Sequence, residues 1–316
     1  MVLPILLLII GIAILVAGAE FMVRGASSMA KKLGVSTIVI GLTIVAFGTS
    51  APELVVNLFS AFKGTTELAI ANVVGSNLAN ILLILGVGAT IRALRVKEGT
   101  TFKEIPFAFL AIILVLIMGN DGRLDNAAFN ILSRADGLAF IAFFCIFLFY
   151  TYNLSKVQGE PEQVETYGWG KSSLMFAGGL IGLVLGGKMI VDNAVILATL
   201  AGMSQNLIGL TIVAVGTSLP ELATTIVAVR KGQDDLAIGN VVGSNIFNVF
   251  WILGLTATIK PLPFDVAANT DVLFTILATV LLFAFMFIGK RHKLERWQGI
   301  LFLLMYFSYI GYAIVR

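Results

Sequence analysis

Two glutamates lie in the middle of apolar segments, each at the end of the same short motif. Glu53 ends the sequence GTSAPE at 48–53, and Glu221 ends GTSLPE at 216–221. The interior of each segment contains no lysine or arginine that would pair with the glutamate. If the segments cross a membrane, an unpaired carboxylate there costs about 3 kcal/mol or more. A bound cation or a proton must therefore compensate for each charge.

Other oxygen atoms accompany both glutamates. Pro52 and Pro220 lack the amide hydrogen that would bond to the carbonyl four residues earlier, so each helix should kink and free the carbonyls of Gly48 and Gly216. A second motif, NVVGSN, occurs at 72–77 and 240–245. The hydroxyl and carboxamide side chains of both motifs, or one helical turn beyond them, are Thr49, Ser50, Ser76, Asn80, Thr217, Ser218, Ser244 and Asn248. Such oxygen ligands suit hard cations, and calcium takes six to eight of them.

The two sets of motifs belong to an internal repeat. Residues 41–91 align with 209–259 at a constant offset of 168 without a gap, and 30 of 51 positions are identical. A buried hydroxyl often bonds only to its own backbone, and a buried asparagine often joins helices. Repetition of the whole set at one offset favours a shared binding site over these separate structural roles.

The composition predicts an all-α membrane protein. Hydrophobic residues make up 58% of the 316 residues and charged residues 12%, about half the charged fraction of soluble domains. About ten apolar segments are long enough to cross a bilayer. We place them at 2–23, 35–60, 67–91, 104–119, 135–154, 173–191, 205–229, 236–259, 271–289 and 297–315.

These segments divide into two five-helix halves, 1–154 and 173–316, joined by a polar linker at 155–172. Because five is odd, the second copy enters the membrane from the opposite side. Such inverted repeats are typical of transporters, whose binding site lies near the midplane where the repeats meet.

The basic residues predict an orientation. With both termini outside, 15 of the 21 lysines and arginines, and the central linker, fall on the cytoplasmic side, as the positive-inside rule requires. Glu20 and Lys188 occupy equivalent positions in the two halves. They either pair with each other or extend their charged groups toward the membrane surface.

At these motifs the sequence resembles the cation/calcium exchanger superfamily, and the prokaryotic sodium/calcium exchangers in particular. The resemblance covers nearly the whole chain and implies ten helices in two inverted halves, with ion sites clustered at the centre. We expect no cofactor, no obligatory oligomer and a place in the prokaryotic cell membrane. No basic stripe with interleaved aromatic residues indicates a nucleic-acid partner. The ligands that the resemblance implies are Thr49, Ser50, Glu53, Ser76, Asn80, Thr217, Ser218, Glu221, Ser244 and Asn248, with the main-chain oxygens of Ala46 and Ala214.

A leading hypothesis and three rivals remain at this point. The leading hypothesis is calcium export driven by sodium entry, gated by rocking of the first and sixth spans. Sodium/calcium members often carry aspartate where this chain has Asn248, and proton-coupled relatives also manage with two glutamates, so proton/calcium exchange is the first rival. A cation channel is the second, although matched buried acids favour saturable binding. An intramembrane enzyme would need a nucleophile with a base, and the only histidine, His292, lies in a loop segment.

Overall fold

The computed structural model describes residues 2–63, 67–124, 128–156, 165–202 and 214–315. The first half consists of α1 (Val2–Leu33), α2 (Thr37–Ile40), η1 (Gly41–Val45), α3 (Ala46–Thr49), α4 (Ala51–Lys63), α5 (Glu67–Ala79), η2 (Asn80–Leu85), α6 (Gly86–Ile91), β1 (Leu94–Arg95), η3 (Thr100–Glu104), α7 (Ile105–Met118), α8 (Asp121–Leu124), β2 (Ile131–Leu132) and α9 (Arg134–Ser155). The second half consists of α10 (Trp169–Leu200), α12 (Ala214–Gly216), α13 (Leu219–Arg230), α14 (Asp234–Ile246), η5 (Phe247–Leu253), α15 (Gly254–Ile259), β3 (Leu262–Pro263), α16 (Ala268–Phe285), β4 (Lys293–Leu294) and α17 (Arg296–Val315).

The chain is an all-α membrane protein, as predicted. Among the described residues, eight helices are long and apolar enough to cross a membrane, and the bent pair Thr37–Thr49 and Ala51–Lys63 makes a ninth. The predicted span at 205–229 falls partly outside the described residues. Its described part is α12 and α13. Two spans are longer than predicted, because α1 continues to Leu33 and α10 begins at Trp169, inside the predicted linker.

The helix breaks lie where the prolines predict them. The chain bends by 45° between Thr49 and Ala51, and Ser50 at the break has φ −82° and ψ 7°. In the second half α12 ends at Gly216 and α13 begins at Leu219. Each break therefore places a glutamate, Glu53 or Glu221, in the first turn of a new helix, where the helix dipole favours a negative charge.

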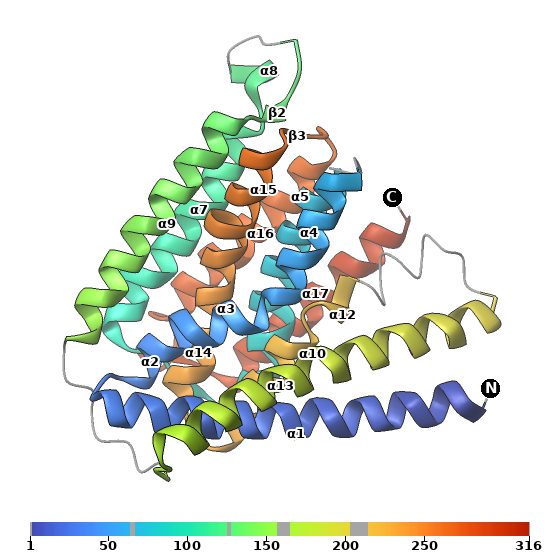
Figure 1. Ribbon diagram of the computed structural model, residues 1–316. Coiled ribbons are helices and arrows are strands. Elements are labelled where there is room, and N and C mark those ends of the chain that lie inside the picture. The colour runs from blue at the N-terminus through green and yellow to red at the C-terminus, as the bar shows by residue number, and fades with distance from the viewer. Residues whose placement is uncertain (1, 64–66, 125–127, 157–164, 203–213, 316) are drawn as a thin grey trace.

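Packing of α1 against α10 shows that the two halves are inverted. Gly11 contacts Gly186, and Gly18 contacts Gly179, so the two helices run antiparallel (Figure 1). Gly11 is equivalent to Gly179 and Gly18 to Gly186 at the offset of 168, so the symmetry exchanges the two contacts. A Cβ on Gly18 would lie 2.8 Å from the Gly179 carbonyl oxygen, which is why this close approach needs glycine.

Two short antiparallel ribbons join the halves at opposite ends of the bundle. β1 pairs with β4, and β2 pairs with β3, which lie together at one end of the molecule in Figure 1. Basic residues gather at the β1–β4 end, where Arg92 pairs with Asp234 at 2.7 Å and Lys97 with Asp235 at 2.5 Å. We call this the basic end, and the β2–β3 end the opposite end.

Candidate functional site

The motif residues of both repeats converge inside the bundle, where α3, α4, α5 and η2 of the first half meet α13, α14 and η5 of the second. Their side chains are almost completely buried, with exposed fractions of 2% or less. This group consists of Thr49, Ser50, Glu53, Ser76, Asn80, Ser218, Glu221, Ser244 and Asn248. Thr217 at the second helix break is only partly buried.

The carboxylate of Glu221 receives hydroxyl groups from both repeats. Ser50 of the first repeat donates to Glu221 Oε1 at 3.0 Å, and Ser244 of the second donates to the same oxygen at 3.4 Å. Because Ser50 lies at the break between α3 and α4, the unwound turn brings its hydroxyl to the opposite repeat. The carboxylate is therefore held at the junction of the two halves.

The carboxylate of Glu53 has fewer hydrogen bonds. Ser76 donates to Glu53 Oε1 at 3.4 Å, which repeats the contact between Ser244 and Glu221. Ser218 is the equivalent of Ser50, but its hydroxyl has no hydrogen-bond partner among the described residues. The site thus departs from its internal symmetry, with the Glu221 side more tightly joined than the Glu53 side.

Thr49 also connects the repeats. Its hydroxyl donates to Asn240 Oδ1 at 3.1 Å and lies 3.3 Å from the Ala46 carbonyl oxygen, one of the two main-chain oxygens implied by the resemblance. The other main-chain oxygen belongs to Ala214, the first residue of α12. Asn240 in turn donates to the Glu221 carbonyl oxygen at 3.3 Å. It therefore fixes the backbone next to the second glutamate.

Four asparagines form a crossed pair of hydrogen bonds in the site. Asn80 donates through Nδ2 to Asn245 Oδ1, and Asn248 donates through Nδ2 to Asn77 Oδ1, both at 2.9 Å. The repeat exchanges Asn80 with Asn248 and Asn77 with Asn245, so the two bonds are symmetry equivalents. Each bond uses the amino group of a predicted ligand, Asn80 or Asn248, and leaves its carboxamide oxygen without a partner among the described residues.

The site contains buried oxygen atoms that have no hydrogen-bond partner among the described residues. They are Glu53 Oε2, Glu221 Oε2, Asn80 Oδ1, Asn248 Oδ1, Thr217 Oγ1 and Ser218 Oγ. A buried polar atom without a partner is unfavourable, and this set includes two carboxylates and two carboxamide oxygens. Within the described residues no three His, Cys, Asp or Glu side chains cluster as a metal site. The donor chemistry therefore suits a hard cation that these oxygens would surround.

The sequence interpretation missed three of these residues, Asn77, Asn245 and Asn240. Asn77 and Asn245 end the two NVVGSN motifs, and Asn240 begins the second one. Because these asparagines occur in both copies of the motif, the repeat indicated that they matter. Spacing alone cannot distinguish an asparagine that binds a cation from one that orients a neighbouring ligand. The pairing considered for Glu20 and Lys188 is wrong. Glu20 instead pairs with Arg24 and Lys231, each at 2.7 Å, and Lys188 pairs with Asp192.

Replacing Asn77 or Asn245 by alanine is expected to weaken calcium binding by about tenfold, or 1.4 kcal/mol. The substitution would free the carboxamide of the predicted ligand, Asn248 or Asn80, to turn its oxygen away from the site. Isothermal titration of the purified variants with calcium measures the change.

Asn120 and Asn269 provide the matched control for this prediction. They form another buried pair, with Asn120 Nδ2 to Asn269 Oδ1 at 2.7 Å and Asn269 Nδ2 to Asn120 Oδ1 at 2.9 Å. Asn120→Ala should lower the free energy of unfolding by about 1–3 kcal/mol, because it leaves a buried polar group unpaired. It should not change the affinity for calcium. Equal affinity losses in Asn77→Ala and Asn120→Ala would contradict the orienting role.

Comparison with known proteins identifies the family. The model of the family described as sodium/calcium exchanger protein matches residues 3–153 and 171–315. The chain is 34% identical over 313 residues to the inner membrane protein YrbG of Escherichia coli, covering 95% of this chain and 94% of the relative. It is 31% identical over 317 residues to the sodium/calcium exchanger MaX1 of Methanosarcina acetivorans, covering 89% of each chain.

Solved structures agree with this assignment. A structure of the sodium–calcium exchanger NCX_Mj soaked with 10 mM sodium and no calcium superimposes with a TM-score of 0.85 at 30% identity, covering 98% of each chain. At this coverage the match extends over both halves. The chain therefore belongs to the sodium/calcium exchanger protein family of integral membrane cation antiporters.

Proposed function

We propose that this protein exchanges calcium for sodium across the membrane at the site formed by Glu53 and Glu221. The observation that supports the proposal best is the group of buried oxygens without partners around these two carboxylates. The carboxamide, hydroxyl and main-chain oxygens of the predicted ligand set complete an all-oxygen environment, which calcium and sodium both accept. No resident cofactor is needed for this activity.

Competition for the same oxygens explains the exchange. With both carboxylates ionised the site has a charge of −2, which one calcium ion neutralises. Sodium ions would occupy the same ligands, so the two cargoes exclude each other. Rocking of α1 and α10 against the central helices would then expose the site to one side of the membrane at a time, as expected for inverted-repeat transporters.

Proton/calcium exchange through the same glutamates is the second candidate. It is favoured by Asn248, which leaves two carboxylates in the site rather than the three found in many sodium/calcium members. In that case Glu53 and Glu221 would release protons when calcium binds. A channel function has no comparable support, because buried acids at two equivalent helix breaks favour tight, saturable binding over rapid conduction.

Calcium uptake into proteoliposomes distinguishes these two functions. We expect uptake under an outward sodium gradient at equal pH on both sides, and none under a pH gradient without sodium. Uptake driven by the pH gradient alone would overturn the sodium proposal and support the proton alternative. Loss of both activities, with calcium binding retained, would overturn antiport itself.

The same proposal places the basic end in the cytoplasm and both termini outside the cell membrane. Most of the basic residues lie in connections assigned to that side, and the positive-inside rule sets the direction. A reporter that is active only outside the cytoplasm should therefore be active when fused after Arg316, and a reporter that is active only in the cytoplasm should be inactive there. Reporter activity in the cytoplasm would contradict this orientation, and insertion of the same reporter at 157–164 is the control with the opposite expectation.

A further inference from the structure

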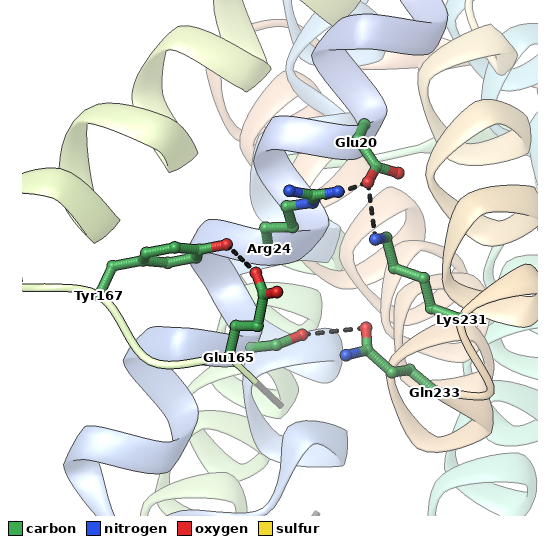
Figure 2. A network of polar contacts seen from close by, with 7 residues as sticks. Glu20, Arg24, Glu165, Tyr167, Lys231 and Gln233 are labelled. Carbon is green, nitrogen blue, oxygen red and sulfur yellow. Dashed lines mark hydrogen bonds and ion pairs between the residues drawn. The ribbon is translucent and has the colours of Figure 1, made fainter. Parts of the chain in front are cut away.

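At the basic end, charged side chains connect α1 to the second half of the protein. Figure 2 shows Glu20 of α1 accepting from Arg24 one turn later and from Lys231, which follows α13. Both ion pairs measure 2.7 Å. Nearby, Ser27 donates to Gln233 at 3.0 Å, which makes a second contact between α1 and the same connection.

The linker reaches the same region. Tyr167 donates its hydroxyl to Glu165, beside Arg24 in Figure 2, and this bond holds the pKa of Glu165 below its ordinary value. The Tyr167 amide also donates to Ser28 of α1 at 2.9 Å. The linker and the α13–α14 connection therefore both contact the basic end of α1.

The internal repeat reverses the charges of the two α1 residues in this cluster but keeps the charge of Lys231. At the offset of 168, Glu20 corresponds to Lys188 and Arg24 to Asp192, so the pair on α1 recurs on α10 with opposite signs. Lys188 and Asp192 form that pair at 2.7 Å. Lys231, by contrast, corresponds to another lysine, Lys63, at the opposite end.

This comparison predicts opposite interactions at the two ends. Where α1 approaches the α13–α14 connection, Glu20 attracts Lys231. If α10 were to approach the α4–α5 connection in the equivalent way, Lys188 would lie beside Lys63. These two positive charges would repel each other. Lys63 is exposed and forms no ion pair with any described residue.

The packing of the helices follows the same asymmetry. α1 packs against α13, whereas no comparable packing joins α10 to α4 within the described parts of the chain. The equivalent side chains Val227 of α13 and Phe59 of α4 are 9% and 62% exposed. Among the described residues, the structure is therefore closed between α1 and α13 at the basic end, whereas the equivalent helices α10 and α4 do not pack together at the opposite end.

We propose that Glu20 and Lys231 form a latch that favours closure at the basic end, and that Lys188 and Lys63 disfavour the equivalent closure at the opposite end. Together these charges set which side of the membrane the transport site faces at rest. The inference rests on the proposed alternating access, and it assigns to four residues outside the ion site a role in the sidedness of exchange.

The expected size of the effect is modest. The side chains of Glu20 and Lys231 are 35% and 27% exposed, so solvent screens the pair. An exposed ion pair contributes at most about 1 kcal/mol, which corresponds to about a fivefold change in an equilibrium between two conformations. Such a change is measurable without abolishing transport, and it should diminish at high salt.

Cysteine reactivity at the two equivalent positions tests the latch. In a Cys145→Ala background, which removes the only native cysteine, Val227→Cys reports opening at the basic end and Phe59→Cys reports the opposite end. Both are measured in lipid nanodiscs with a water-soluble maleimide. Adding Glu20→Gln should raise the reaction rate at position 227 by about threefold to fivefold and lower the rate at position 59.

Opposite signs at the two positions distinguish a conformational shift from simple loosening, which would raise both rates. The charge exchange Glu20→Lys with Lys231→Glu should restore the low rate at position 227. Unchanged rates in Glu20→Gln, or an increase at both positions, would overturn the latch.

The second half offers an independent test in the other direction. Lys188→Glu creates the attractive pair with Lys63 that the native chain lacks, so it should also raise the rate at position 227 and lower the rate at position 59. Adding Lys63→Gln should cancel this change, and a Lys188→Glu effect that survives it would contradict the proposal. These labelling rates can be measured without transport, so they test the latch even if sodium/calcium exchange fails its own test. If the rates at positions 227 and 59 do not change in opposite directions, the latch is refuted while the proposed function is not.

Discussion

Replacing either Glu53 or Glu221 by glutamine is expected to abolish calcium transport while leaving the protein folded. Each carboxylate has one oxygen without a hydrogen-bond partner among the described residues, in a side chain that is 1% exposed. Glutamine keeps the shape and removes the charge, so calcium would remain only partly neutralised in a buried site. Removing one partner of a buried charge pair costs about 2–5 kcal/mol, so affinity should fall by at least about 30-fold. Calcium uptake in proteoliposomes and calcium titration of the purified variants measure the two effects.

Glu104 provides a matched control for this prediction. It is another buried acid, 2% exposed, whose Oε2 likewise has no partner among the described residues, but it ends η3 and its Oε1 accepts from Tyr150 of α9. Glu104→Gln should therefore retain transport. Near-normal transport in folded Glu53→Gln or Glu221→Gln would refute the assigned site. Equal loss of transport in Glu104→Gln would show that the effect is not specific to Glu53 and Glu221.

The fold was predictable because the sequence encodes it locally and twice. Apolar segments of membrane length, a gap-free repeat and an odd number of spans per half predict an inverted architecture before any contact is known. The helix breaks were also predictable, because proline removes a specific hydrogen bond. The structure places both breaks at the predicted motifs.

Side-chain orientation was not predictable in the same way. Spacing placed Asn80 and Asn248 on the motif faces, but it did not show that Asn245 and Asn77 bind their amino groups. Those partners come from the opposite repeat, so they depend on how the halves are docked. The interaction between Glu20 and Lys231 likewise joins residues 211 positions apart in the chain. Composition and periodicity contain no information on such pairs.

The asymmetry of the site was also absent from the repeat. The Ser50 hydroxyl donates to Glu221, but the hydroxyl of the equivalent Ser218 has no hydrogen-bond partner among the described residues. Identical motifs predict identical environments, whereas a transporter closed at one end must break the equivalence. The proposed latch would contribute to this difference, because the repeat places glutamate at position 20 and lysine at position 188.

Membrane voltage is expected to change the direction of exchange at fixed pH. If three sodium ions replace one calcium ion, each cycle moves one net positive charge across the membrane. One charge crossing 100 mV corresponds to about 2.3 kcal/mol, or about a 50-fold change in the calcium gradient at equilibrium. Proteoliposomes with sodium on both sides and a potassium potential set by valinomycin measure this effect. Exchange that ignores the potential and requires a pH gradient would support two protons for one calcium, which is electroneutral.

Under the proposed exchange of three sodium ions for one calcium ion, with both glutamates ionised, the charge at position 248 would determine which half of the cycle senses the voltage. With neutral Asn248 the calcium-loaded site has no net charge, and the site loaded with three sodium ions has a charge of +1, so calcium/calcium exchange should be insensitive to voltage. Asn248→Asp should preserve this insensitivity. Asn77 presents its Oδ1 to position 248 while its amino group donates to the Asn245 carbonyl oxygen at 3.1 Å. A carboxyl group there must keep its proton to donate to Asn77, so calcium/calcium exchange that became voltage-sensitive in Asn248→Asp would show that the new carboxylate ionises.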